Sequence, residues 1–262
     1  MSNKYAAQLY CFSSLKADDF EEKIAKLAEA GYEGIEFCGG FDMEPEKLKA
    51  VMAKYNLAIV SWHTGIERFY DAEFDASVAY LNAIGCKSAV VPGLPGELSG
   101  DAENLKKTAA LFNDLSEKLK PYGIKLGYHN HWWEFVKYED GTAPFDVFFD
   151  NTNFDITCQV DIGHALNGRQ MTLAEIFSRY KGRFNYVHLK PYSLTLGAED
   201  HGKGYQTYVG EDDIPWKEVL STLKADGSTE WYIVELEYSG DKGPIKVLSD
   251  AIVYLKELEK TL

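Results

Sequence analysis

Histidines and acidic residues follow short apolar runs at several places in this 262-residue chain. They occur in the segments GYHNHWWEF (127–135), DIGH (161–164), VHLK (187–190) and IVELE (233–237). Imidazole nitrogens and carboxylate oxygens bind divalent transition-metal ions, and a carboxylate can also take a proton from a substrate. These residue types therefore predict acid/base chemistry assisted by a bound metal.

The elements that must position these residues are apolar or β-branched runs that alternate with amphipathic stretches of helical period. The predicted strands cover residues 6–12, 34–39, 58–63, 88–93, 124–130, 157–163, 185–190 and 231–237. The predicted helices cover residues 19–31, 44–56, 75–85, 102–123, 173–180, 214–227 and 244–260. Eight strands with helices between them, in about 250 residues, have the size of a (β/α)8 barrel. We therefore predict the α/β class and a single TIM-barrel catalytic domain over residues 1–262. A doubly wound open sheet is the alternative, but no G-x-G-x-x-G motif follows the first strand.

Barrel enzymes carry their active sites at the C-terminal ends of the strands. The polar residues at the predicted ends are Glu36, His63, His129, His131, Asp161, His164, His188, Lys190, Glu235 and Glu237. Side chains of a strand alternate between the barrel interior and the helix layer, and this parity turns His129, His188 and Glu235 inward. These three side chains and Asp161, which ends the sixth apolar run, are therefore predicted to converge from four consecutive strands.

Two imidazoles and two carboxylates suit one divalent cation such as Mn²⁺, Zn²⁺, Co²⁺ or Fe²⁺. The alternative interpretation is that each residue is a hydrogen-bonded polar group at a strand end. Because parity brings all four to the functional end of the barrel, the sequence favours the metal site.

Taken together, these motifs and the loop segment VGEDDIPW (209–216) resemble the sugar isomerase/epimerase family of xylose-isomerase-like TIM barrels. That family includes ketose 3-epimerases and inosose-processing enzymes. The resemblance implies one divalent cation, often Mn²⁺, with Co²⁺, Zn²⁺, Mg²⁺ or Fe²⁺ as alternatives. It also implies that Asp161, His188 and Glu235 are ligands and that His164 contacts the substrate.

The fifth strand departs from the epimerase pattern, in which a glutamate serves as both ligand and acid/base group. His129 stands at that position here, as in an "HNH" branch of the family, and Glu134 is the nearest carboxylate. Epimerisation needs two acid/base groups that flank one carbon, and Glu235 with His164 or Glu134 would supply them. We therefore expect a metal-dependent isomerase or epimerase of a small keto-sugar or polyol ketone. A lyase or dehydratase that expels a β-leaving group from a keto-sugar or keto-glycoside is the alternative, and a non-catalytic sugar-binding barrel is a more distant one.

Residues that surround the predicted metal site are expected to bind a carbohydrate substrate. The candidates for substrate binding are Glu36, His63, His131, Trp132 and Lys190. The aromatic ring of Trp132 can stack on the C–H face of a sugar, although packing against the barrel rim is an equally ordinary use. A loop over residues 191–216 is long enough to form a lid. Because few basic residues lie nearby, an unphosphorylated substrate is favoured.

The charge of the chain narrows its partners. Forty-one acidic residues against 27 basic ones give a formal net charge of -14, with no basic cluster, so we expect no nucleic-acid partner. No apolar stretch approaches the roughly 20 residues of a membrane span, and no signal sequence is recognised at the start. We expect a cytoplasmic protein without a membrane partner. Formation of a homo-oligomer, or association with a second subunit, is left open.

Overall fold

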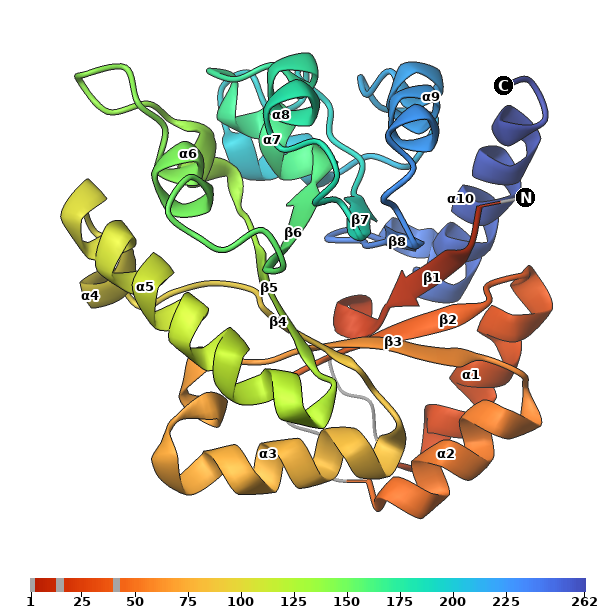
Figure 1. The fold of residues 1–262 in the computed structure, drawn as a ribbon. Helices are drawn as coiled ribbons and strands as arrows, with labels where there is room; N and C mark the ends of the chain where they lie inside the picture. Colours follow the sequence, from red (N-terminus) through yellow and green to blue (C-terminus); the bar gives the residue numbers. More distant parts are fainter. Residues whose placement is uncertain (1–2, 13–16, 40–42) are drawn as a thin grey trace.

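Parallel strands form a closed barrel in which each strand pairs with the next in the sequence and β8 returns to β1 (Figure 1). The computed structural model describes residues 3–12, 17–39 and 43–262. The strands are β1 (Tyr5–Gln8), β2 (Gly34–Cys38), β3 (Ala58–His63), β4 (Ser88–Val91), β5 (Lys125–His129), β6 (Thr157–Asp161), β7 (Tyr186–Leu189) and β8 (Trp231–Val234). The predicted (β/α)8 TIM barrel is confirmed.

Helices surround the barrel and cover its outer face (Figure 1). They are α1 (Ala17–Ala30), α2 (Pro45–Lys54), α3 (Asp71–Ile84), α4 (Gly96–Ser99), α5 (Ala102–Leu119), α6 (Pro144–Phe149), α7 (Ile162–Gly168), α8 (Leu173–Arg179), α9 (Trp216–Asp226) and α10 (Pro244–Glu259). The short helices α4, α6 and α7 were not predicted. In α6 nearly every side chain is buried, so the segment lacks the polar face that marks an amphipathic helix. Within the described ranges, no helix is long and apolar enough to cross a membrane.

Seven of the eight strands end before the predicted residue, and three of them bear on the site. The first stops at Gln8 and continues as a 3₁₀ turn, and the eighth stops at Val234. The sixth was predicted over 157–163 but stops at Asp161. The Asp161 carboxylate accepts a hydrogen bond from the backbone N–H of His164 at 2.8 Å and caps α7, so the helix begins directly at the strand end.

Side-chain parity separates two apolar regions from the polar site. On the outer faces of the strands, residues such as Leu126, Tyr128 and Val234 pack into the main core under the helices. A smaller apolar cluster of Ala6, Val60, Tyr186 and Ile233 fills the barrel interior. The parity predicted for β5, β7 and β8 is thus confirmed, and the inward residues that follow this cluster along the strands are polar.

Candidate metal and active site

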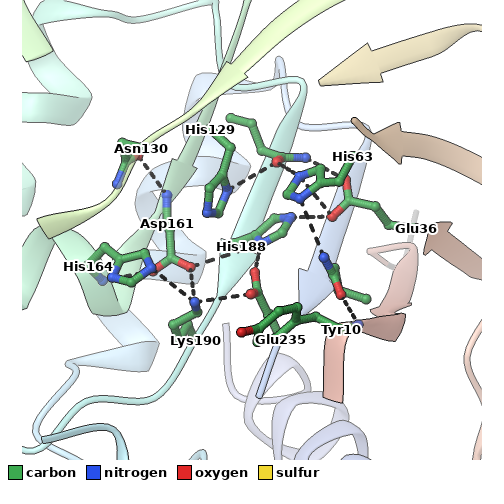
Figure 2. A network of polar contacts seen from close by, with 12 residues as sticks. Tyr10, Glu36, His63, His129, Asn130, Asp161, His164, His188, Lys190 and Glu235 are labelled. Carbon is green, nitrogen blue, oxygen red and sulfur yellow. Dashed lines mark hydrogen bonds and ion pairs between the residues drawn. The ribbon is translucent and has the colours of Figure 1, made fainter. Parts of the chain in front are cut away.

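The four predicted ligands converge at the C-terminal end of the barrel, as Figure 2 shows. One ligand atom from each of His129, Asp161, His188 and Glu235 can be chosen so that all lie within 4.8 Å of one another, and all four residues are buried. Strand register produces this convergence, because Asp161 pairs with His188 across β6 and β7 and His188 pairs with Ile233 of β8. Two imidazoles and two carboxylates at this spacing form a donor set suited to a divalent transition metal.

One carboxylate oxygen of Asp161 accepts a hydrogen bond, and the other has charged neighbours but no hydrogen bond. Its Oδ1 accepts from the backbone of His164, and its own backbone N–H donates to Asn130 Oδ1 at 3.0 Å. Its Oδ2 is buried without a hydrogen-bond partner, 3.6 Å from Lys190 Nζ and 4.0 Å from His188 Nδ1. Burying a carboxylate oxygen without a hydrogen bond costs free energy, and a metal ion bound to this oxygen would offset that cost. The residues present therefore fit a bound divalent metal.

His188 lies between two carboxylates. Its Nδ1 is 2.5 Å from Glu235 Oε2, on the side of the other ligands, and its Nε2 is 2.6 Å from Glu36 Oε2. Burial alone would lower the pKa of His188, but the carboxylates of Glu36 and Glu235 outweigh it and raise the pKa to about 10. Of the two ring nitrogens, Nδ1 faces the other ligands and would bind a metal in place of its proton, while the Glu36 carboxylate beside Nε2 orients the ring in the way that outer carboxylates support metal-bound histidines.

Gln159, in the middle of β6, connects the carboxylate of Glu36 to His129. This residue was not predicted from the sequence. Its Nε2 donates to Glu36 Oε1 at 2.7 Å, which turns its Oε1 toward His63 Nε2 at 2.5 Å and His129 Nδ1 at 3.1 Å. A nitrogen that faces a carbonyl oxygen must carry a hydrogen. His129 is therefore protonated on Nδ1 and keeps its Nε2 lone pair for a metal. Burial and the neighbouring His188 hold the pKa of His129 well below its usual range, which keeps it neutral.

Lys190 is buried among carboxylates. Its Nζ lies 2.8 Å from Glu237 Oε1, 3.1 Å from Glu235 Oε1 and 3.6 Å from Asp161 Oδ2. Burial opposes its charge, but Glu235 and the other two carboxylates raise the pKa of Lys190 well above its usual range. Glu36 adds a fourth carboxylate beside His188, so the cluster holds more carboxylates than cationic groups, and a divalent cation would offset excess negative charge.

His164 follows the cap of α7 and lies beside Lys190. Its Nε2 is 3.0 Å from Lys190 Nζ and its Nδ1 is 2.5 Å from the hydroxyl of Tyr205. The helix approaches β7 this closely because Gly163 has no side chain, since a Cβ atom there would lie 2.6 Å from the carbonyl oxygen of Lys190. His164, a predicted acid/base partner of Glu235, is therefore linked to Glu235 through Lys190.

The remaining predicted residues lie around this cluster. The ring of His63 is buried and stacks on His188 at 5.2 Å, and Glu36 Oε2 lies close to Nε2 of both rings. The half-buried ring of His131 stacks on Trp133 at 4.4 Å, and Trp132 lies 5.2 Å from the ring of His201.

Glu134 lies outside the group of four ligands. Its Oε1 accepts from the hydroxyl of Tyr128 at 2.5 Å and its Oε2 from the backbone N–H of His131 at 3.0 Å. Tyr128 belongs to the main core under the helices, so Glu134 is held on the outer side of β5.

Comparison with known proteins agrees with this architecture. A family model described as "Xylose isomerase-like TIM barrel" matches residues 24–258, and the chain belongs to this family. It is 25% identical to an inosose dehydratase of Serratia proteamaculans over 273 residues, which cover 92% of this chain and 91% of that protein.

Two solved structures share the fold. A sugar phosphate isomerase/epimerase of Parabacteroides distasonis superposes with a TM-score of 0.80 at 22% identity, over 98% of this chain and 94% of that one. A 3-keto-D-glucoside 4-epimerase of E. coli superposes with a TM-score of 0.69 at 16% identity, over 98% of this chain and 100% of that one. The family resemblance inferred from the motifs is confirmed.

Proposed function

We propose that this protein is a metal-dependent lyase that dehydrates a cyclic polyol ketone or keto-sugar. Support comes from the cluster of His129, Asp161, His188 and Glu235 and from the full-length similarity to a protein named inosose dehydratase. The observation that carries the proposal is the chain of contacts beside Glu235. This carboxylate faces the ammonium group of Lys190, which also donates to His164 Nε2.

The chemistry follows from these positions. When bound, a divalent cation, most often Mn²⁺ in the family that the motifs resemble, polarises a carbonyl as a Lewis acid. Glu235 takes the proton from the carbon next to that carbonyl, since Lys190 holds the pKa of Glu235 well below its usual range despite burial and keeps it ionised. A hydrogen-bond donor near Lys190 and His164 then assists departure of the hydroxyl group on the next carbon.

Epimerisation, which the sequence favoured, is the second candidate, because it begins with the same removal of a proton. The observation in its favour is the ring of His131, which lies 4.8 Å from that of His164 and provides a second imidazole at the rim. Glu134 offers no comparable support, since both of its carboxylate oxygens accept hydrogen bonds. We therefore assign Glu134 the role of positioning the loop after β5.

The proposed substrate is uncharged. Lys190 already makes ion pairs with Asp161, Glu235 and Glu237, so its ammonium group is not free to bind a phosphate. The rim of the site carries Trp132 and the stacked pair His131 and Trp133, whose flat faces suit the C–H surface of a polyol ring. An inosose, the ketone of an inositol, has this character.

The test begins with chelator-treated protein that is reloaded with Mn²⁺, Co²⁺, Zn²⁺, Mg²⁺ or Fe²⁺. Each form is incubated in D₂O with an inosose, a ketose and a 3-keto-glucoside, and the products are followed by NMR. We expect loss of water from the inosose by the metal-loaded protein and no reaction by the metal-free protein. An epimer that contains deuterium, formed without loss of water, would show that the protein is an epimerase and would contradict the lyase proposal. Absence of both metal binding and reaction would favour a binding barrel.

A further inference from the structure

Tyr205 brings a hydroxyl group from outside the barrel to the proposed active site. It ends the 3₁₀ turn His201–Tyr205 in the long connection between β7 and α9. Its hydroxyl oxygen lies 2.5 Å from His164 Nδ1 and 2.8 Å from Asn167 Nδ2. The side chain is half-buried, and its ring lies 5.8 Å from Lys190 Nζ.

The direction of the hydrogen bond from His164 follows from Lys190. A lysine ammonium group can only donate, and Lys190 Nζ faces His164 Nε2 at 3.0 Å. That nitrogen must therefore carry the lone pair, and the hydrogen of the neutral ring is on Nδ1. His164 consequently donates to the oxygen of Tyr205.

The direction of the second hydrogen bond to Tyr205 follows from the partners of Asn167 Oδ1. Asn167 Oδ1 accepts from the hydroxyl of Tyr192 at 2.7 Å and lies 2.5 Å from His201 Nδ1. The amide nitrogen of Asn167 is therefore the atom turned toward Tyr205, and it donates. The two lone pairs of the Tyr205 oxygen are both occupied, and among the residues that the structure describes no acceptor is found for its own hydrogen.

We infer that Tyr205 is the general acid that protonates the leaving hydroxyl group of the substrate. This inference rests on the proposed dehydration. Glu235 removes the proton beside the carbonyl, and the electron pair of that C–H bond first passes into the carbonyl group. In a later step this pair forms the C=C bond as the C–O bond on the next carbon breaks. The departing oxygen takes the hydrogen of Tyr205 and leaves as water. The hydrogen bonds from His164 and Asn167 stabilise the phenolate oxygen, and Tyr205 and Glu235 recover their starting states by proton exchange with solvent.

The connecting loop is built to hold Tyr205 in this place. The backbone N–H of Ser193 donates to the carbonyl oxygen of Gly204 at 2.8 Å, which closes the loop on itself. Gly204 packs against the ring of Tyr192, where a Cβ atom would lie 2.3 Å from ring carbons. The residue before the proposed acid is therefore constrained by the same tyrosine that orients Asn167.

The test compares Tyr205→Phe with Tyr254→Phe, a matched control on α10 whose ring contacts the same loop at Gly210. Both variants are loaded with Mn²⁺ and given an inosose, and an analogue with fluorine in place of the leaving hydroxyl group. Fluoride departs without taking a proton. We expect Tyr205→Phe to slow loss of water about 10²- to 10⁴-fold, and to change loss of fluoride by less than about threefold.

The second readout is the total rate at which the inosose loses its proton in D₂O. This rate is the sum of deuterium exchange into the substrate and elimination. It should persist in Tyr205→Phe, and Tyr254→Phe should match the original protein with both compounds. Equal slowing of both compounds, or unchanged loss of water, would overturn the assignment of Tyr205 while the dehydratase proposal stands. If the original protein loads Mn²⁺ but removes neither water nor a proton from the inosose, the proposed function itself fails and the assignment with it.

Discussion

Gln159 Nε2 donates a hydrogen bond to Glu36 Oε1 at 2.7 Å, and this contact joins the middle of β6 to β2 across the barrel interior. It settles which end of the amide faces the histidines, and hence which nitrogen of His129 is available to a metal. Glu36 also faces Nε2 of His188. Two of the proposed ligands thus depend on one buried pair that is not itself in the ligand group.

Replacing Gln159 by leucine should weaken Mn²⁺ binding about 10- to 100-fold, because His129 loses the acceptor that fixes its tautomer and ring orientation. The dissociation constant can be measured by calorimetry or by competition with a metal indicator. Gln170→Leu is a suitable control, since Gln170 is exposed and accepts only from the backbone of Lys137. Equal affinity in the two variants would show that Gln159 does not position the ligand.

His188→Ala and Asp161→Ala should each abolish stoichiometric metal binding while the barrel remains folded. Each change removes one of the four converging ligands, and the remaining three leave an incomplete site. Metal content can be measured by elemental analysis after dialysis, and folding by circular dichroism. A full equivalent of metal in either folded variant would contradict the assignment.

Lys190→Met should lower the free energy of unfolding of the metal-free protein by about 3–5 kcal/mol, since Asp161, Glu235 and Glu237 then lose their shared buried cation. Excess Mn²⁺ should stabilise this variant more than the original protein, because it restores positive charge to the same carboxylates. Urea unfolding with and without metal measures both effects. A variant as stable as the original protein would show that the carboxylates are compensated in another way.

Glu134 should make stability depend on pH in a predictable direction. Burial raises the pKa of Glu134 to about 7, despite the hydrogen bonds that it accepts from Tyr128 and His131. Because its pKa in the folded protein exceeds that in the unfolded chain, the folded state holds the proton more tightly, and stability falls as pH rises from about 4.5 to about 7. The loss is on the order of 3 kcal/mol.

Comparison with Glu134→Gln isolates this contribution from other buried groups. The unfolding free energy of the variant, measured in urea from pH 4.5 to 8, should decline less steeply over that interval. Parallel curves for the two proteins would mean that Glu134 is ionised throughout and that its surroundings compensate the charge.

Parity was sufficient to predict the convergence of the candidate ligands where strands are regular. In β7 and β8 the alternation runs without interruption from Tyr186 to His188 and from Ile233 to Glu235, so the inward residues could be read from the sequence. The position of Asp161 was also predicted, although its role in ending β6 was not. A carboxylate that caps the next helix looks in a sequence like the last residue of an apolar run.

The supporting residues could not be predicted because their importance comes from contacts distant in the chain. Gln159 is one polar residue within a buried strand, and its function appears only when Glu36 and His63 reach it from β2 and β3. The register of those two strands shifts after Ile35, and this brings Ser61 opposite Glu36, which simple alternation does not anticipate. Tyr205 lies in a loop without periodic pattern, so no sequence signal separated it from neighbouring tyrosines.

The closure of the barrel by pairing of β1 with β8 has a consequence for the order of events during synthesis. Glu235 follows the last strand, whereas Glu36, which supports His188, belongs to the second. A ribosome-bound chain that has not yet released β8 possesses the supporting residue and three ligands but lacks the fourth. With the proposed ligand set, tight metal binding would therefore require β8, and a bound cation would stabilise the completed fold by mass action.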